Sequence, residues 1–427
     1  MRLEIESINI MDVQEGSKTH AEDHVLYINL KELEELILKD NRIRSVAINL
    51  VKPDDPVRIV NVVDVIQPRC KIGMGGEDFP GWIGKLKVAG SGRTRSLQGI
   101  SVVLSNRVSK RSYSAILDMF GRGAELSRYG SMRNVSIDPI ASDGAEERDF
   151  ENAVKLAGLR TSVYLAQAAV GHIIDLREIY ELNLSTRQKS KLPRVAYGYL
   201  MYTSQHDYQG VPDPIFYGNQ VTEILPTVIH PNEVLDGAVV NAHTVRAQET
   251  YSIQNHAIIK ELYKMHGKEL EFAGVVVFAA SMEPIKRQMI AMMTANLVSN
   301  VLGVDGVVLT KVHGGMPHID LAFAAEACEE RGVKSTIFIQ SLHSGSSKTE
   351  QALFSSDRLD AIVNFGQTLE RISLGKAENI LGGTTETKIY HPDYIQKAAD
   401  ERIEIEGFLL AGVYDHMGGS RTMAVDY

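Results

Sequence analysis

The sequence has few cysteines, no long apolar run and no block of like charge. Only Cys70 and Cys328 are present, and neither belongs to a CxxC pair or to a Cys/His zinc pattern. A disulfide framework is therefore not expected, and both thiols are expected to pack in the interior. Because no apolar stretch approaches the ~18–20 residues that cross a bilayer, a membrane-spanning protein is not expected either.

The 427 residues carry a formal net charge of −9, which argues against nucleic acid or an anionic membrane as the main partner. The first residues, Met-Arg-Leu-Glu-Ile-Glu, alternate charged and apolar side chains, which suits a strand and not a signal peptide. We therefore expect a cytoplasmic protein. At roughly 100–200 residues per domain, the length predicts two or three domains.

The first half of the chain predicts a mixed α+β domain. Apolar runs between polar turns predict strands at Val25–Asn29, Ser45–Val51 and Arg58–Ile66 and a helix at Leu30–Leu38. The glycine-rich segment 73–99 is expected to be an ordered loop, and it lacks the strand–GxGxxG–helix order of a phosphate cradle. Apolar residues recur at helical spacing from Asp149 to Leu182, which predicts one long helix or two in succession.

The second half predicts a doubly wound, mostly parallel sheet, so that the whole chain is of the α/β class. Its continuous apolar strands alternate with helices, as strands covered on both faces do. The expected strands are Phe272–Ala280, Gly306–Thr310, Lys334–Ser341 and Leu359–Phe365, with helices at Glu283–Leu302, Asp320–Arg331 and Lys348–Phe354. A separate strand is expected earlier in the chain, at Val195–Tyr202. On the first helix, Met289, Met292 and Met293 are expected to be packing residues of the core.

Polar side chains follow the expected parallel strands at the points where the strands end, and ligands of open α/β sheets bind beyond those carboxyl ends. Ser281 and Glu283 follow the first strand of the C-terminal half, and Gln367 follows the last; we expect these three to contact substrate. The remaining candidates are histidines with one carboxylate, and they lie in the two loops between these strands: His313, His318, Asp320 and His343.

Two chemistries fit this histidine cluster. Three imidazoles and a carboxylate from neighbouring loops suit Zn²⁺ or Fe²⁺, so His313, His318, Asp320 and His343 are candidate metal ligands. The same side chains could instead act singly, as hydrogen-bond donors to substrate or, for His343, as a general base. The H-x4-H-x-D spacing is not a standard metal motif. A purely structural role for the histidines stays open as a third interpretation.

One stretch is more specific. Residues 226–241, PTVIHPNEVLDGAVVN, resemble a segment of the component B proprotein of glycine, sarcosine and betaine reductases, and matching blocks lie on both sides in the same order. These blocks are GEDFPG at 76–81, GSGRT at 90–94, DMFGRGAELS at 118–127, HGKELEF at 266–272 and LGVDGVV at 302–308. The resemblance covers essentially the whole chain. It implies a β-subunit-like N-terminal domain at 1–243 and an α-subunit-like C-terminal domain at 244–427.

The resemblance also implies a chemistry. In that family the proprotein is cleaved before a cysteine, which becomes a pyruvoyl group, and its carbonyl forms a Schiff base with the substrate amine. A separately encoded partner subunit supplies the selenol or thiol for reductive C–N cleavage. This sequence departs from the pattern, because the aligned junction is His243-Thr244, or Ala242 in a shifted register. We therefore expect an uncleaved chain without a pyruvoyl group, and His243 and Thr244 become candidate catalytic residues at the former cofactor position.

Three functions stay open. The first is a component-B-like oxidoreductase subunit of an oligomeric complex, acting with a partner on a small, polar, nitrogen-containing substrate. The second is a metal-dependent enzyme of Zn or Fe type on the same scaffold, in which a Lewis acid replaces the lost carbonyl. The third is a non-catalytic subunit of a reductase complex.

Overall fold

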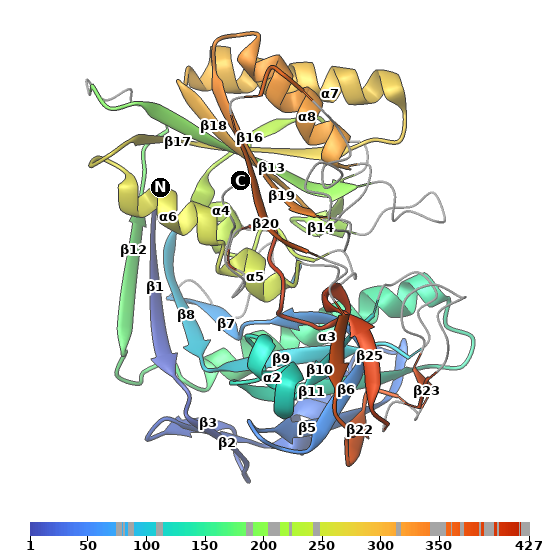
Figure 1. Ribbon diagram of the computed structural model, residues 1–427. Helices are drawn as coiled ribbons and strands as arrows, with labels where there is room; N and C mark the ends of the chain where they lie inside the picture. Colours follow the sequence, from blue (N-terminus) through green and yellow to red (C-terminus); the bar gives the residue numbers. More distant parts are fainter. Residues whose placement is uncertain are drawn as a thin grey trace.

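A computed structural model gives the arrangement of the chain. It describes residues 1–73, 79, 82–83, 89–107, 114–184, 191–203, 214–221, 224–241, 248–312, 317–341, 356–359, 361–367, 371–383, 386–387, 397–398, 401–417 and 419. In Figure 1 a C-terminal sheet with its helices lies above an N-terminal body that holds two large sheets. The short helix α5 (Thr250–Gln254) lies between the two parts.

The C-terminal sheet has six strands, and its main ladder is parallel, as predicted. In spatial order the strands are β16 (Thr227–Ile229), β17 (Glu271–Ala280), β13 (Arg194–Thr203), β18 (Gly306–Lys311), β19 (Lys334–Ser341) and β20 (Ala361–Gln367). Only the short edge strand β16 is antiparallel to its neighbour. One face is covered by α7 (Pro284–Asn296) and α8 (Pro317–Glu329), and the other by α4 (Pro231–Leu235), α5 (Thr250–Gln254) and α6 (Ala257–Met265) (Figure 1).

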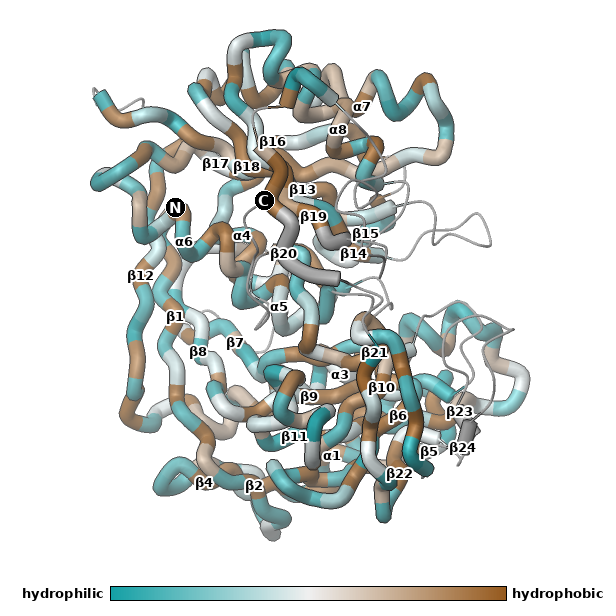
Figure 2. The backbone as a smooth tube through the Cα atoms, viewed as in Figure 1, coloured by the Kyte–Doolittle hydropathy of each residue, from teal (hydrophilic) through white to brown (hydrophobic). Residues whose placement is uncertain are grey.

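Strand β17 shows why this part of the sequence reads as continuous apolar runs. All of its residues are buried, because helices cover both faces of the sheet. Val275 and Val277 belong to the core on the α6 side, whereas Val276 and Phe278 belong to the core under α7 and α8. Figure 2 shows the resulting brown stretches along the central strands.

The N-terminal body combines a six-stranded mixed sheet with a four-stranded one, as a mixed α+β prediction requires. The first runs β10 (Ala115–Asp118), β6 (Val57–Ile66), β9 (Ile100–Ser105), β11 (Arg133–Ala141) and β5 (Ile43–Val51), and its sixth strand, β22 (Asn379–Leu381), pairs with β6 outside this order. The second runs β12 (Leu176–Glu181), β1 (Arg2–Asn9), β8 (Gly92–Gln98) and β7 (Arg69–Ile72). Helices α1 (Leu30–Ile37) and α3 (Glu147–Gln167) pack beside them, and β2 (Asp12–Glu15), β3 (His20–Glu22) and β4 (Val25–Ile28) form a small third sheet.

The helical prediction for Asp149–Leu182 is wrong in its second part. Helix α3 ends at Gln167, and Leu176–Glu181 forms strand β12, antiparallel to β1. The helical period continued past Gln167 only through residues such as Ile173, which is 92% exposed. The strand sequence Leu-Arg-Glu-Ile-Tyr-Glu has no strict alternation of apolar and polar residues, and its pairing with β1 is a long-range contact that a local period does not contain.

Two smaller expectations also need correction. The glycine-rich segment 73–99 is not irregular throughout, because Gly92–Gln98 is strand β8, paired with both β1 and β7. On α7, Met289 and Met292 are not core residues, since they are 36% and 50% exposed. Met293 is half-buried. The expected helix at Lys348–Phe354 lies outside the described residues.

After the C-terminal sheet the chain returns to the N-terminal body. Strand β22 (Asn379–Leu381) joins β6, while β21 (Arg371–Leu374) pairs with β25 (Ile403–Glu406). The anchor is Arg58, which forms a fully buried ion pair with Asp118 at 2.7 Å and donates to the Gly375 carbonyl at 2.7 Å. Two strands of the C-terminal sheet, β13 and β16, precede residue 243 in the chain. The division of the chain at residues 243 and 244 therefore stays a prediction.

In the described part of the chain, none of the helices combines the length and the apolar character needed to cross a membrane.

Replacing Arg58 with methionine tests the anchor. The variant leaves the Asp118 carboxylate buried without its charge partner, so we expect the free energy of unfolding to fall by about 3–5 kcal/mol. Arg122→Met is the matched control, because the Arg122–Glu125 pair is exposed and should contribute little. Urea unfolding followed by circular dichroism measures both. Equal midpoints for Arg58→Met and the unsubstituted chain would contradict the assignment.

Candidate functional site

The segment 226–241 folds as a capped turn of helix. His230 begins α4: its Nδ1 accepts the Asn232 N–H at 3.1 Å, and Glu233 reaches back to the His230 N–H at 2.6 Å. Asp236 ends the helix and accepts hydrogen bonds from the Gly90 N–H at 2.8 Å and the Thr94 hydroxyl at 2.6 Å. This set of contacts fixes the path of the chain into Asn241.

Asn241 and Gln248 hold together the two ends of the segment between them. The Asn241 side-chain amide donates to the Gln248 carbonyl at 2.8 Å, and the Asn241 N–H donates to the Thr250 hydroxyl at 3.0 Å. Lys155, from helix α3, donates to the Asn241 carbonyl and is itself 1% exposed. Asn241 and Gln248, the described residues on either side of 242–247, are therefore both held in the interior.

Asp64 connects this arrangement to the N-terminal sheet. Its carboxylate accepts the Thr250 N–H at 2.9 Å and the Thr250 hydroxyl at 2.6 Å. Burial raises the pKa of Asp64 to about 6, although the hydrogen bonds from Thr250 and the nearby Lys155 charge oppose the shift. The Asp64 carboxyl group is thus buried beside hydrogen-bond donors, and it takes up a proton in mildly acidic solution.

An aromatic wall lies on the other side of Gln248. The Tyr199 hydroxyl donates to the Gln248 side-chain carbonyl at 3.0 Å, and the Tyr197 ring stacks on Tyr199 with centroids 5.7 Å apart. His256 meets the edges of both rings, with centroid distances of 4.8 and 5.3 Å. Its Nδ1 accepts the Ile259 N–H, so Nε2 carries the proton, and that atom has no partner among the described residues. Burial lowers the pKa of His256 to about 3, so the ring is neutral.

Tyr197 leads from this wall to the carboxyl end of β18. Its hydroxyl hydrogen-bonds to that of Thr310, whose neighbour Lys311 is fully buried at the end of the strand. Burial lowers the pKa of Lys311 to about 7. Burial also lowers the pKa of His416, and the neighbouring positive charges of Lys311 and His318 lower it further. These three basic groups therefore lie together at this end of the sheet.

Two residues near the C-terminus, Gly412 and Asp415, contact Glu249 and Arg128. Glu249 accepts the Gly412 N–H at 2.8 Å and lies beside Arg128, which contacts Asp415 at 3.4 Å. Burial raises the pKa of Glu249 to about 7, and the Asp415 charge adds to the shift. Two buried carboxyl groups thus share one arginine.

We call the whole set the buried polar belt. Its members are titratable or hydrogen-bonding side chains, all buried except the partly buried Arg128, that run from the N-terminal sheet to the end of β18. They are Asp64, Arg128, Lys155, Tyr197, Tyr199, Gln248, Glu249, Thr250, His256, Thr310, Lys311, Asp415 and His416.

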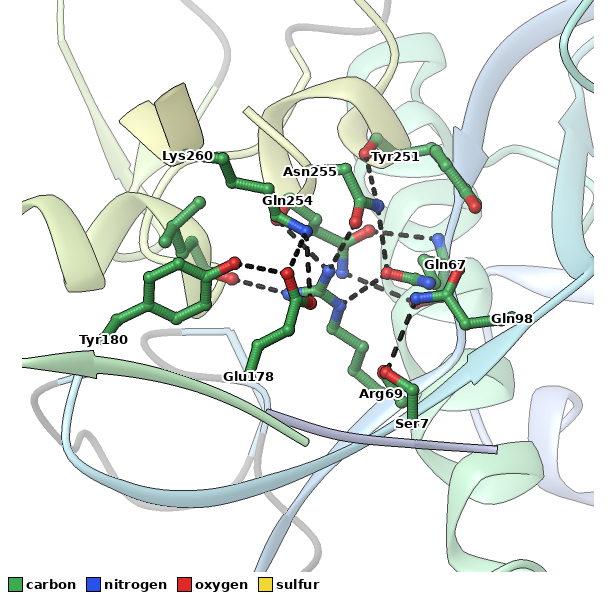
Figure 3. A network of polar contacts seen from close by, with 12 residues as sticks. Ser7, Gln67, Arg69, Gln98, Glu178, Tyr180, Tyr251, Gln254, Asn255 and Lys260 are labelled. Atoms are coloured by element: carbon green, nitrogen blue, oxygen red, sulfur yellow. Dashed lines mark hydrogen bonds and ion pairs between the residues drawn. The ribbon is translucent and has the colours of Figure 1, made fainter. Parts of the chain in front are cut away.

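A second polar network supports the belt from the side of the four-stranded sheet (Figure 3). Arg69, on β7, is buried, and it donates to the Leu235 carbonyl at 2.6 Å, the Gln254 carbonyl at 3.1 Å and the Gln67 side chain at 2.7 Å. Burial lowers the pKa of Arg69, because neutral carbonyls rather than a directly paired carboxylate satisfy it. Arg69 therefore joins β7 to Leu235 and Gln254, which lie before and after Asn241 in the chain.

The sequence-predicted residues Ser281 and Asp320 meet at the start of α7 and α8. Asp320 accepts the Ser281 N–H and contacts Arg287 at 3.3 Å, and Arg287 donates to the Ser281 carbonyl at 2.6 Å. Burial raises the pKa of Asp320 to about 6. Glu283 lies apart from this group: it is exposed and pairs with Lys286 at 3.3 Å. The roles assigned to these residues from sequence stay predictions.

The remaining predicted residues are described only in part. His318 is buried in the first turn of α8, close enough to His416 to affect its charge. Gln367 ends β20, and its side chain is not described. The predicted catalytic residues His243 and Thr244 and the predicted ligands His313 and His343 lie outside the described residues. Within the described ranges, no group of three or more His, Cys, Asp or Glu side chains is placed to hold a metal ion.

Sequence reasoning missed most of the belt. A usable signal was present, because Asp64 interrupts the run Val-Val-Asp-Val-Ile and Lys311 ends the run Val-Val-Leu-Thr-Lys. A charged residue inside a buried strand must be paired or must shift its pKa. Glu249 and Asp415 carry no comparable local signal, since their burial arises from contact between distant segments.

Comparison with known proteins agrees with the sequence resemblance. The family described as glycine/sarcosine/betaine reductase component B subunits matches residues 1–423. The glycine reductase complex component B subunits alpha and beta of Acetoanaerobium sticklandii are 33% identical over 100% of both chains. From Peptoclostridium acidaminophilum, the sarcosine reductase complex component B subunit alpha is 32% identical over 86% of each chain. The betaine reductase counterpart is 29% identical over 90% of this chain and 88% of its own. No solved structure matches.

Replacing Glu249 with glutamine tests the buried carboxyl group through pH. Because the folded pKa of about 7 exceeds the ordinary 4.5, the folded chain holds this proton more tightly, and its stabilising effect is complete below about pH 4.5. It is lost as the pH rises through 7, by about 3 kcal/mol. Glutamine does not titrate. The stability of Glu249→Gln relative to the unsubstituted chain should therefore rise by this amount between pH 4.5 and 8.

Urea unfolding at a series of pH values measures this difference. Glu125→Gln is the control, since Glu125 is exposed, and its stability should follow that of the unsubstituted chain at every pH. A difference between Glu249→Gln and the unsubstituted chain that stays constant from pH 4.5 to 8 would show that Glu249 titrates normally.

Proposed function

The chain belongs to the family of glycine/sarcosine/betaine reductase component B subunits, and from that premise we propose that it is an oxidoreductase subunit of component B type. It acts on a small polar substrate that contains nitrogen and cleaves a C–N or related bond reductively. A separately encoded partner subunit completes the reaction. The names of the curated relatives, which include glycine, sarcosine and betaine reductase complexes, support this substrate class and the need for a partner.

The observation that carries the proposal is the fixed position of Asn241 and Gln248. In the family resemblance, the reactive group arises just after the block that ends at Asn241. Here Asn241 and Gln248, on either side of the following segment, are hydrogen-bonded to each other, and Lys155 and Thr250 of the buried polar belt hold Asn241, while Asp64 holds Thr250. Chain that only linked two domains would run over the surface and would not need buried charges at both ends. We place the substrate at this part of the belt.

The residues present do not fit a pyruvoyl group. That group forms by elimination from a serine or cysteine at a new N-terminus, and the aligned residue is Thr244. Neither cysteine can replace it: Cys70 is buried in β7 and Cys328 in α8, and the α8 residue packs in the core under the C-terminal sheet. We therefore assign no step to a pyruvoyl carbonyl.

The belt supplies what reductive cleavage asks of the protein. The partner's thiolate or selenolate donates an electron pair to the carbon and forms an S–C or Se–C bond, the C–N bond breaks with its electron pair going to nitrogen, and the departing amine takes up a proton. Glu249 and Lys311 are the belt groups whose pKa values lie nearest neutral pH, at about 7, so each can hold or release a proton there. A buried carboxylate such as that of Asp64 favours an ammonium group beside it.

A metal-dependent enzyme is the second candidate. It is favoured by the burial of His318 and Asp320 in the first turn of α8, beside His416 at the carboxyl end of β18. With His313 and His343, these residues would hold Zn²⁺ or Fe²⁺, and the ion would polarise the substrate as a Lewis acid. Against it, the Asp320 carboxylate already contacts Arg287 and the Ser281 N–H.

An amine-release assay separates the two candidates. The purified full-length chain is mixed with a thiol- or selenol-bearing partner subunit, a dithiol reductant and glycine, sarcosine or betaine. We expect release of ammonia, methylamine or trimethylamine from at least one of the three. Lys155→Met should lower the rate at least tenfold without changing the circular dichroism spectrum, because it releases the Asn241 carbonyl.

The controls decide between a reductase subunit and a metal enzyme. Protein purified without a metal-affinity tag is analysed for transition metals, and the assay is repeated with a chelator. Activity that survives chelation with less than about a tenth of an equivalent of metal removes the metal-dependent alternative. Activity that is lost on chelation and restored by Zn²⁺ or Fe²⁺ would replace our proposal with that alternative. No release from any of the three amines would overturn the assigned substrate class.

Intact mass tests the absence of processing. We expect a single species at the full 47.2 kDa, and the same result for Thr244→Ala, because neither residue can form a pyruvoyl group. Denaturing electrophoresis and mass spectrometry measure both proteins side by side. Two fragments from the unsubstituted chain, with a carbonyl-blocked N-terminus that is absent in Thr244→Ala, would show that threonine supports cleavage and a 2-oxobutanoyl group.

A further inference from the structure

A cavity of about 450 Å³ lies in the N-terminal body, where helix α2 (Gly121–Leu126) packs beside strand β21. Residues 413 and 414 form its third wall. None of its described lining residues belongs to the buried polar belt, so the cavity is separate from the site described above. Its volume is that of sites that bind small molecules.

The inner lining of the cavity is apolar. Ile372, Val413 and Tyr414 are buried, and they belong to the core that packs β21 and β25 onto the N-terminal body. Leu126, at the end of α2, packs against the same core. An apolar group that enters such a cavity leaves water, which favours its binding. The inner lining therefore fits a hydrocarbon or aromatic part of a ligand.

The charged residues of the lining are both arginines, one from each of two walls. Arg122 comes from α2 and Arg371 from β21, and their side chains are 62% and 72% exposed. No carboxylate belongs to the lining that the described residues form. In a chain with a net charge of −9, two arginines at one cavity create a local preference for an anion.

Three glutamates lie near these arginines, and each is outside the described lining. Glu125 contacts Arg122 at 3.3 Å, and Glu404 contacts Arg371 at 3.9 Å. Glu406 lies opposite Arg371 in the pairing of β21 with β25. Both ion pairs are exposed, and exposed pairs of this kind contribute little to stability. A bound oxyanion can therefore take the place of a glutamate beside either arginine.

Ser373 adds a hydroxyl group and a third positive charge to the same rim. Its hydroxyl oxygen accepts a hydrogen bond from Arg402 at 3.2 Å, and its own O–H can donate to a ligand oxygen. The rim thus offers several donors from different elements, whereas the inner lining is apolar. This combination suits an organic molecule with one anionic end.

The walls of the cavity continue directly into the buried polar belt. Helix α2 is followed by Ser127, whose hydroxyl donates to the Ala411 carbonyl at 2.6 Å, and by Arg128, whose N–H donates to the Gly412 carbonyl at 3.1 Å. Asp415, which follows the lining residue Tyr414, contacts Arg128 at 3.4 Å. The two walls are therefore hydrogen-bonded to each other next to the belt.

Gly412 leaves this connection little slack. Its φ is +77°, and a Cβ atom at this position would lie 2.6 Å from the Tyr129 ring, so the backbone is tightly packed here. The same residue donates its N–H to Glu249 of the belt at 2.8 Å. Close-packed interiors transmit displacements rather than absorb them. A ligand that shifts Val413 or Tyr414 therefore also shifts a hydrogen-bond donor of Glu249.

We propose that this cavity binds a small organic oxyanion, a carboxylate or a phosphate ester with an apolar part, and that the bound molecule acts on the buried polar belt through residues 411–415. The oxyanion accepts hydrogen bonds from Arg122 and Arg371, while the apolar part covers Ile372 and Val413. Binding does not depend on the function proposed above. The role of the bound molecule as an effector rests on that function, which places the substrate at the belt.

Calorimetric titration of the full-length chain tests the site with four probes. Phenyl phosphate and benzoate each carry an oxyanion and an apolar ring, and at least one of them should bind with a dissociation constant below about 1 mM. The tighter of the two shows whether the site takes phosphate or carboxylate. Inorganic phosphate lacks the ring and benzylamine carries the opposite charge, so both should bind at least about tenfold more weakly.

Three variants locate the bound probe. Arg122→Gln and Arg371→Gln should each weaken binding about tenfold, because each removes a charged hydrogen-bond donor. Ser373→Trp should abolish binding, since the indole ring occupies the cavity. Arg44→Gln and Ser45→Trp are the matched controls on β5, where both residues are exposed and neither lines the cavity. Both controls should bind the probe as the unsubstituted chain does.

Circular dichroism spectra and melting temperatures show whether each variant is folded, and the arginine variants decide the test if Ser373→Trp does not fold. Unchanged binding in both arginine variants, or no binding of either ring-bearing oxyanion to the unsubstituted chain, would overturn the site. Inorganic phosphate or benzylamine that binds as tightly as phenyl phosphate would overturn the assigned ligand class.

Hydrogen exchange followed by mass spectrometry tests the action on the belt. With the tighter probe bound, the amides of residues 411–415 and of α5, which follows Glu249, should exchange at least about threefold more slowly. The amides of β5 are the control and should exchange at the same rate. Because neither substrate nor partner subunit is present, a failed amine-release assay is distinguished from a failed effector site. Slower exchange at 411–415 without a change in α5 would overturn the action on the belt.

Discussion

The hydrogen bonds between Asp64 and Thr250 are the contact on which the centre of the molecule depends. Asp64 lies in a strand of the N-terminal body, whereas Thr250 begins the short helix under the C-terminal sheet. Thr250 in turn holds Asn241, so this one carboxyl group sets where the chain enters the C-terminal half. Because the group is buried, it tolerates little displacement: a lost hydrogen bond would leave a charge without compensation in the interior.

Buried polar contacts also connect the N-terminal body with the C-terminal half at two other places. Arg69 satisfies its guanidinium with carbonyl groups from both ends of the Asn241 segment, and Arg58 uses Asp118 and the Gly375 carbonyl to hold the returning C-terminal strands. Apolar packing between the bodies would permit sliding, since it is not directional. Buried arginines accept only particular geometries, because all five donors point in fixed directions. The polar contacts therefore define how the bodies meet, while the apolar cores within each body supply most of the stability.

Sequence patterns predicted the elements that neighbouring residues determine, and they missed the features that arise from contacts between distant segments. The strands from Phe272 onwards were found because helices cover both faces of their sheet, which leaves a continuous apolar run. Strand β12 was missed because its order comes from pairing with β1, more than 160 residues away. The belt divides in the same way: Lys311 stands at a predicted strand end, but Glu249 becomes buried only when Gly412 packs against it. The local period of apolar residues carries no information about such long-range contacts. It likewise placed the methionines of α7 in the core, because helical spacing alone does not tell which side of a helix faces the core.

The buried charges around Asn241 and Gln248 bear on the function proposed for the segment between these two residues. Lys155 and Asp64 are buried charges, and buried pairs of this kind are often no more stable than apolar residues of similar size. If the segment after Asn241 were an ordinary linker, apolar residues such as leucine or methionine at these positions would avoid that cost. The chain instead has both charges in its interior, with Thr250 between them and a neutral His256 beside Tyr197 and Tyr199. Because stability alone does not favour this arrangement, it supports our proposal that this part of the chain serves the reaction and binds the substrate.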